Sequence, residues 1–207
     1  MTSAAAYTCG FQSLSQCYPE EGVARLKSGN WHARDYLARL IGQWYGSRVE
    51  RVVDCRPIPK ARISTEVPYG HLGYHPANIA ACLNEPDIRV WRFTRYIELL
   101  YLFGSRAMTP NDGTELASVY VCRQGKHRSV MWSAIENAII NGLGGISCRE
   151  VPVCYAAQKQ MRCQKRGCDQ CDPLSADVQA LTQAAVGEFY AVALCVDAVF
   201  EAEVCEA

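Results

Sequence analysis

The string CRQGKHRS, residues 122–129, places a thiol, a glycine, four basic side chains and a hydroxyl within one short segment. Side chains of these types can bind an oxyanion, and a glycine between them gives the backbone freedom to curl around one. The sequence therefore predicts a phosphate-binding loop. Its predicted binding residues are Cys122, Arg123, Gln124, Gly125, Lys126, His127, Arg128 and Ser129.

Each position in this loop has a chemical role that follows from its residue type. Arg128 can offer a planar fork to two phosphate oxygens, while Lys126 and His127 add further charge or hydrogen-bond donors. Gly125 allows several backbone N–H groups to converge on one point. Ser129 can cap a helix or hydrogen-bond the neighbouring sulfur of Cys122. Together they predict a site for a phosphorylated sugar, a nucleotide or a backbone phosphate.

The elements on either side of the loop would position it. The apolar run at 116–122 predicts a strand, and the pattern at 127–141, stopped by glycines, predicts a helix. Ligands in α/β sheets bind where loops leave the carboxyl ends of strands, and a helix start favours an anion there. The loop is therefore expected at the functional edge of a sheet.

Strands and helices alternate along the rest of the chain. Further strands are expected at 4–11, 48–59 and 146–153, and further helices within 20–46, at 79–83, at 86–104 and from 173 onward. For the helix at 86–104, the spacing predicts an apolar stripe of Val90, Phe93, Ile97, Leu100 and Tyr101. We expect an α/β fold, a layered, mostly parallel sheet with helices on both faces, followed by a Cys-rich segment and a C-terminal helix.

The loop fits the Cys-x5-Arg-Ser pattern and thus resembles protein tyrosine phosphatases. That resemblance implies a thiolate nucleophile at Cys122 and a phosphoryl clamp at Arg128. A phosphatase also needs a general acid for its leaving group, and Asp54, Asp112 and Glu115 are candidates. None of them lies in a Trp-Pro-Asp segment. A cysteine-dependent phosphatase is therefore kept as the alternative function.

A longer stretch of the sequence, which includes this loop, resembles the C-terminal domain of the RapZ RNase adapter family. The string CRQGKHRSV is similar to the family's Cys-Thr-Gly-Gly-Lys-His-Arg-Ser-Val loop, and RVVDCRPIPKAR resembles its Asp-Val-Arg strand. The resemblance also includes HPANIAACLNEPDIRVWRFTRYIELL and covers roughly residues 9–150, with an added helical insert at about 20–46. The expected organisation is a RapZ C-terminal-like domain at 1–150, with a cysteine-rich basic segment and final helix at 151–207 packed on it.

The RapZ resemblance implies binding of an amino sugar phosphate and of small RNA rather than established catalysis. It adds Asp54 and Arg56 to the predicted phosphate site, from the Asp-x-Arg motif. Arg123 and Gln124 depart from the family's small loop residues. Tyr74 falls where the family has an aspartate, with His71 and His75 close by. The G-x-x-x-x-G-K-[ST] string of the full-length adapter does not occur here, so nucleoside triphosphate hydrolysis is not expected.

Cysteines are frequent, with 12 in the 207-residue chain, and several gather near the C-terminus. Thiolates at these spacings can close a tetrahedral zinc site, and a Cys-x2-Cys pair favours one. A redox pair and incidental buried thiols are the alternatives. The predicted zinc ligands are Cys154, Cys163, Cys168 and Cys171.

A basic cluster lies among these cysteines, and RNA is the macromolecular partner that it predicts. The predicted RNA-binding residues are Lys159, Arg162, Lys165 and Arg166. Arginines 89, 92, 95 and 123 would extend the cluster. Because the formal net charge of the chain is +0, such binding would depend on local charge. A run of cations that merely faces solvent is the simpler alternative.

The remaining expectations concern cellular location, membrane association and the role of the last helix. The N-terminus lacks a cationic stretch followed by an apolar one, so a cytoplasmic protein is expected. No membrane association is expected, because the longest apolar stretch is short and contains Asp197. A third hypothesis is a scaffold that assembles through its last helix and keeps a vestigial pocket. The sequence does not indicate an oligomeric state.

Overall fold

A computed structural model of the chain describes residues 2–12, 14, 33–58, 71, 73–104, 115–144, 146–153 and 168–205. For residues 2, 33–34, 103–104 and 197–205 it describes the backbone alone. The predicted zinc ligands Cys154 and Cys163 and the predicted RNA-binding cluster at 159–166 lie outside these ranges. So does Asp112, one of the candidate general acids.

Four parallel strands form the sheet, in the order β2-β3-β1-β4. They are β1 (Thr2–Gly10), β2 (Arg48–Asp54), β3 (Leu116–Cys122) and β4 (Ile146–Pro152). The helices are α2 (Ala33–Tyr45), α3 (Pro76–Asn84), α4 (Arg89–Gly104), α5 (Arg128–Gly142) and α7 (Ala176–Cys205), with a short 3-10 turn, η3 (Pro86–Ile88), before α4. The predicted layered α/β fold with a C-terminal helix is confirmed.

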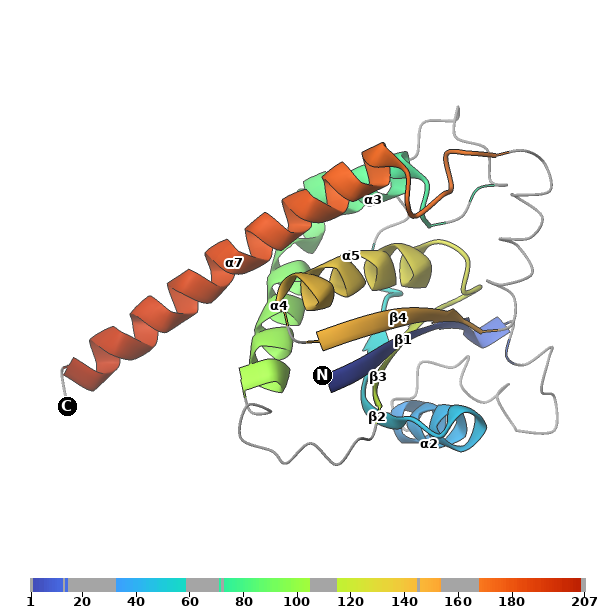
Figure 1. Cartoon of the computed structure of the whole chain (residues 1–207), viewed down its shortest axis with the longest axis horizontal. Helices are drawn as coiled ribbons and strands as arrows, with labels where there is room; N and C mark the ends of the chain where they lie inside the picture. The colour runs from blue at the N-terminus through green and yellow to red at the C-terminus, as the bar shows by residue number, and fades with distance from the viewer. Residues whose placement is uncertain are drawn as a thin grey trace.

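The helices cover both faces of the sheet (Figure 1). In that view α2 lies below the strands, α3, α5 and α7 lie above them, and α4 lies to their left. Alternate strand residues point to opposite faces, so Ala5 and Val119 pack towards α2 while Ala6 and Tyr120 pack towards α5. The two central strands are thus buried on both sides, as the apolar runs of β1 and β3 require.

The buried face of α4 matches the predicted stripe only in part. Val90 and Tyr101 are 79% and 78% exposed, whereas Tyr96 and Leu99 are fully buried. The reason is Arg92, which is buried against α7. Its guanidinium donates hydrogen bonds to the Glu188 carboxylate at 2.7 and 2.8 Å. Burying this ion pair turns Val90 and Tyr101 outward, whereas Phe93 and Leu100 still pack partly buried against the core.

Helix α7 begins on the core and then extends beyond it (Figure 1). The hydroxyl of Ser175 accepts a hydrogen bond from the Val178 N–H at 3.4 Å, which caps the helix start. Val178, Ala185 and Phe189 are buried, whereas Leu194 is 70% exposed. Within the described residues, α7 is also the one helix whose segment Ala176–Val196 has the length and composition of a membrane span. Just 28% of that apolar stretch is buried.

Candidate functional site

The predicted phosphate loop lies between β3 and α5, in the middle of the sheet. Cys122 is the last residue of β3, and Arg128 is the first of α5. Gly125 has φ 65°, a left-handed conformation that glycine adopts without strain. Its N–H donates a hydrogen bond to the Cys122 sulfur at 3.1 Å, and that sulfur lies 3.3 Å from the Ser129 hydroxyl. The loop therefore curls over a buried thiol.

The end of β1 supports the loop from one side. The N–H of Gln12 donates a hydrogen bond to the Arg123 carbonyl oxygen at 2.9 Å. A Cβ atom on Gly10 would lie 2.1 Å from the carbonyl carbon of Gln124. Because that neighbour is backbone, no side-chain rotation could relieve the overlap. Gly10 is therefore required for the close approach of β1 to the loop.

A segment just before α3 supports the loop from the other side. The N–H of Gly73 donates a hydrogen bond to the Lys126 carbonyl oxygen at 2.9 Å. A Cβ atom on Gly73 would lie 2.3 Å from the His127 carbonyl oxygen and 2.6 Å from the Met131 nitrogen. Gly73 thus packs against the first turn of α5. The loop is held on both sides by glycines that sequence analysis did not single out.

Arg128 reaches back from α5 to the chain that leaves β2. Its Nη1 donates hydrogen bonds to the carbonyl oxygens of Arg56 at 2.5 Å and Ile58 at 3.1 Å. Among the described residues, its Nη2 and Nε atoms make no hydrogen bond. The guanidinium is therefore fixed through one nitrogen and keeps two donors for a ligand.

His127 is the N-cap residue of α5, and its side chain makes no capping hydrogen bond. Its Nε2 atom lies 2.8 Å from the carbonyl oxygen of His71. A carbonyl oxygen can only accept, so Nε2 carries the proton. Burial, with a smaller contribution from the charge of Lys126, lowers the pKa of His127 to about 4. The imidazole is thus neutral at pH 7, and His127 serves as a donor rather than as an added cation.

The Asp-x-Arg motif lies beside the loop, but its charges pair with each other. Nε and Nη2 of Arg56 donate to the Asp54 carboxylate at 2.8 and 2.6 Å, and the guanidinium lies 4.8 Å from the ring centre of Phe11. The hydrogen bond to Asp54 raises the pKa of Arg56. Arg56 contacts Arg128 through its carbonyl oxygen. The motif therefore shapes the wall of the site beside Arg128.

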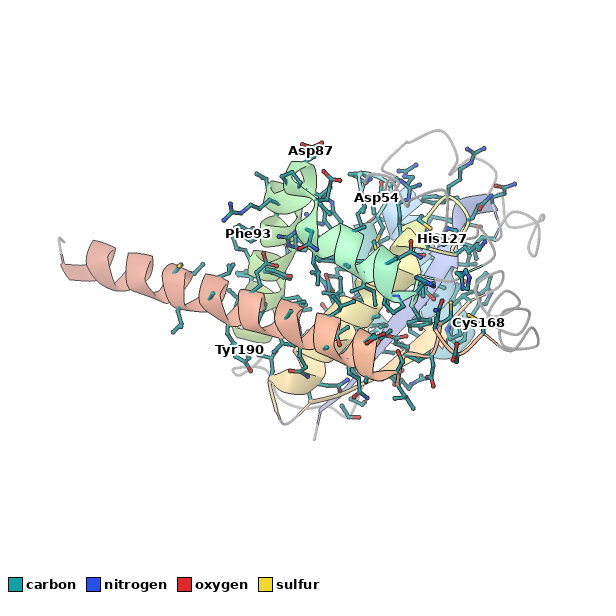
Figure 2. All side chains as sticks on the ribbon, turned by 90° about the horizontal axis from the view of Figure 1, so that it is seen from above. Asp54, Asp87, Phe93, His127, Cys168 and Tyr190 are labelled. Atoms are coloured by element: carbon teal, nitrogen blue, oxygen red, sulfur yellow. The ribbon has the colours of Figure 1, made fainter. Side chains whose placement is uncertain are left out.

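A second cluster joins His71 to the two cysteines that precede α7. The Nδ1 atom of His71 lies 3.2 Å from the Cys168 sulfur and 3.3 Å from the Cys171 sulfur. All three potential ligand atoms lie within 4.8 Å of one another, an arrangement that could hold a metal ion. Figure 2 places Cys168 and His127 at the same end of the molecule, away from the C-terminal end of α7. Burial, then His75 and Lys126, lower the pKa of His71 and favour its neutral form.

The arginines expected to extend the RNA-binding cluster do not form one surface. Arg92 is 5% exposed and paired with Glu188, so it is unable to contact a nucleic acid. Arg95 pairs with Glu98 at 2.7 Å. Arg89 and Arg123 are exposed on separate elements. Of these arginines, Arg123 alone belongs to the phosphate loop.

An apolar groove lies between α4 and α7, at the other end of the molecule from Cys168 in Figure 2. Its volume is about 580 Å³, and Phe93, Val192 and Val196 contribute to its wall. The exposed half of α7 continues from it. The scaffold hypothesis would depend on this surface.

No family model matches the chain, and no curated protein or solved structure is significantly similar to it. The resemblance to the RapZ C-terminal domain therefore stays a prediction.

The sequence alone did not indicate His71 as a candidate metal ligand, nor the two supporting glycines, Gly10 and Gly73. His71 lies 97 residues before Cys168, so no spacing rule connects them. Its segment, rich in glycine, proline and tyrosine, offered one signal, because a histidine in such a loop is available for binding. Gly10 ends a strand, and a glycine there signals a close backbone approach.

Proposed function

We propose that this protein binds a phosphoryl group in the loop from Cys122 to Ser129, without hydrolysing it. The supporting observation is the hydrogen bond from the Gly125 N–H to the Cys122 sulfur at 3.1 Å. It means that the Gly125 N–H points inward, towards the buried thiol at the base of the loop. A loop that curls in this way is the form that backbone anion sites take.

The start of α5 adds two favourable features. The side chain of the N-cap residue does not satisfy the first N–H groups of the helix, which leaves donors for an anion. The helix dipole also favours negative charge at this end. Arg128 begins the same turn and has two guanidinium nitrogens to offer. An oxyanion would thus meet backbone amides and a guanidinium together.

Binding is favoured over catalysis because the two described candidates for the general acid, Asp54 and Glu115, are unsuited to that role. Asp54 is held by the Arg56 guanidinium. Glu115 lies just before β3, at the opposite end of the strand from Cys122, and accepts hydrogen bonds from Arg149 at 2.7 Å. His127 is neutral at pH 7 and adds no positive charge to stabilise a thiolate. A phosphatase with a Cys122 nucleophile and an Arg128 clamp is therefore the second candidate.

The ligand class follows from the residues around the loop. Arg123 and Gln124 are exposed at its rim, where they would contact the rest of a phosphorylated molecule. The RapZ resemblance suggests an amino sugar phosphate or an RNA phosphate as that molecule. We include both in the proposal, as phosphorylated ligands of a cytoplasmic protein.

The affinity for inorganic phosphate, measured by calorimetric titration, tests the binding proposal. Arg128→Lys keeps the positive charge but loses the planar guanidinium and its paired N–H donors. We expect the affinity for phosphate to fall about tenfold, the equivalent of one charge-assisted hydrogen bond. Arg48→Lys is the matched control, because Arg48 lies at the start of β2 and pairs with Glu50. Equal affinities in all three proteins would refute the proposal.

Hydrolysis of an aryl phosphate separates binding from catalysis. We expect no turnover by the unmodified protein, and Cys122→Ser should keep phosphate affinity because it preserves the loop. Turnover that Cys122→Ser abolishes would instead establish the phosphatase. Thermal unfolding of each variant checks that the fold is intact.

A further inference from the structure

His71, Cys168 and Cys171 come from two segments far apart in the sequence. His71 lies before α3, and both cysteines lie before α7. Cys171 is 2% exposed, and it packs with Tyr74 and Val130 in a small cluster of its own. The two sulfurs and the imidazole nitrogen therefore meet where the start of α7 rests on the core.

The geometry suits a tetrahedral metal ion better than a set of thiol hydrogen bonds. Both sulfurs lie close to the same Nδ1 atom, at 3.2 and 3.3 Å, although one nitrogen offers one donor or one lone pair in the plane of the ring. Zinc bonds of about 2.3 Å to sulfur and about 2.0 Å to nitrogen give a tetrahedral sulfur–nitrogen edge of about 3.5 Å. Each sulfur thus needs to move away from the nitrogen by only a few tenths of an ångström.

The surroundings of the three residues hold them in place. His75 packs its ring edge against His71, with ring centres 4.7 Å apart. Its Nε2 atom is hydrogen-bonded to Gln170 at 3.0 Å, and Gln170 lies between the two cysteines in the sequence. Its Nδ1 atom accepts a hydrogen bond from the Ala77 N–H at 3.2 Å, which fixes the ring at the start of α3. The two segments are therefore joined by His75 as well as by the cluster.

We propose that His71 Nδ1, Cys168 Sγ and Cys171 Sγ bind one Zn²⁺ ion, which joins the start of α7 to the segment before α3. Soft thiolates with an imidazole in tetrahedral geometry select zinc among the common divalent ions. Two thiolates also balance the charge of the ion. A tetrahedral zinc ion takes one further donor besides these three.

The zinc site is connected to the phosphate loop through the backbone of its histidine ligand. The His71 carbonyl oxygen accepts the hydrogen bond from His127, and Gly73, two residues on, donates to Lys126. A metal that fixes His71 would thus fix one side of the loop. This connection depends on the proposed phosphate function, whereas zinc binding itself does not.

Metal analysis of the 207-residue chain, purified under reducing conditions without a chelator, tests the proposal. We expect about one zinc ion per chain, and less than about a tenth of that in His71→Ala, Cys168→Ser and Cys171→Ser. Cys195→Ser is the matched control, because Cys195 is an exposed free cysteine of α7. It should keep the full zinc content.

Cobalt substitution tests metal binding in the unmodified chain, so the result does not depend on whether a variant folds. The unmodified chain with Co²⁺ in place of zinc should show thiolate-to-cobalt charge transfer and the intense visible bands of a tetrahedral ion. A reduced chain that binds neither metal would overturn the proposal, as would a disulfide between Cys168 and Cys171 found by mass spectrometry. If the chain binds no metal but its phosphate affinity still depends on Arg128, the zinc proposal is refuted and the phosphate proposal is not.

Discussion

The Nε2 atom of His127 donates a hydrogen bond of 2.8 Å to the carbonyl oxygen of His71. This bond joins the first turn of α5, which carries the proposed phosphate site, to the segment that carries the proposed zinc ligand. Both sites therefore lie at the carboxyl end of the sheet. Their common support is a short stretch of backbone around Gly73.

Gly73→Ala should disrupt this support. The new Cβ atom would meet the His127 carbonyl oxygen at 2.3 Å, and backbone is unable to rotate away. We expect the free energy of unfolding, measured in urea, to fall by about 1–3 kcal/mol or more, with weaker phosphate binding. Gly187→Ala is the control, since a Cβ there meets nothing within 4 Å and α7 should gain about 0.5–1 kcal/mol. Equal effects of both substitutions would contradict the assigned contact.

Removing the buried carboxylate of Glu136 should destabilise the fold strongly. Glu136 pairs with Arg51 and accepts hydrogen bonds of 2.5 Å from Tyr120 and Trp132. Among the described residues, Glu136→Leu would leave Arg51 with the carboxylate of Glu98, 3.6 Å away, and with the uncharged hydroxyls of Ser118 and Tyr120. We expect a loss of roughly 3–5 kcal/mol, measured by denaturant unfolding, because a buried charge would lose its partner.

A double substitution separates this charge effect from packing. Arg51→Met combined with Glu136→Leu removes both charges, so it should recover much of the stability that Glu136→Leu loses. If the double variant is instead less stable than the single one, the loss comes from altered core packing.

Glu150 should make the fold less stable as the pH rises. Burial of its carboxyl group raises its pKa above the usual 4.5, even though Tyr74 and Asn137 donate hydrogen bonds to it. The folded state therefore favours the protonated form. This contribution to stability is complete below pH 4.5 and is lost as the pH rises through the folded pKa.

Glu150→Gln removes that dependence. The variant should be more stable than the unmodified protein at pH 7, and the difference should shrink as the pH falls towards 4.5. Thermal unfolding across this pH range measures the difference. A difference that stays constant with pH would mean that Glu150 is not the group responsible.

The strand, loop and helix around Cys122 could be predicted because their signals are local. The apolar run of β3, the glycine and the cluster of cations are all contained in one continuous stretch of sequence, residues 116–129. The face of α4 could not be predicted, because Arg92 is buried by Glu188, which is 96 residues away. The partner that buries a charge is a property of the tertiary structure.

The cluster of His71, Cys168 and Cys171 could be predicted only in part, for the same reason. The Cys168–Cys171 pair has a local spacing signal, whereas His71 joins it only through the packing of α7 on the segment before α3. The roles of Gly10 and Gly73 also depend on close backbone approaches between distant segments. In each case the sequence contains the residue but does not show which distant residue packs against it.

The central claim is tested most directly by titrating the isotopically labelled protein with inorganic phosphate and following its backbone amides by NMR. The account predicts saturable shifts that are largest for the amides of residues 124–129 and that weaken in Arg128→Lys. Shifts that are absent, or that fall mainly outside the loop and do not change in Arg128→Lys, would contradict it.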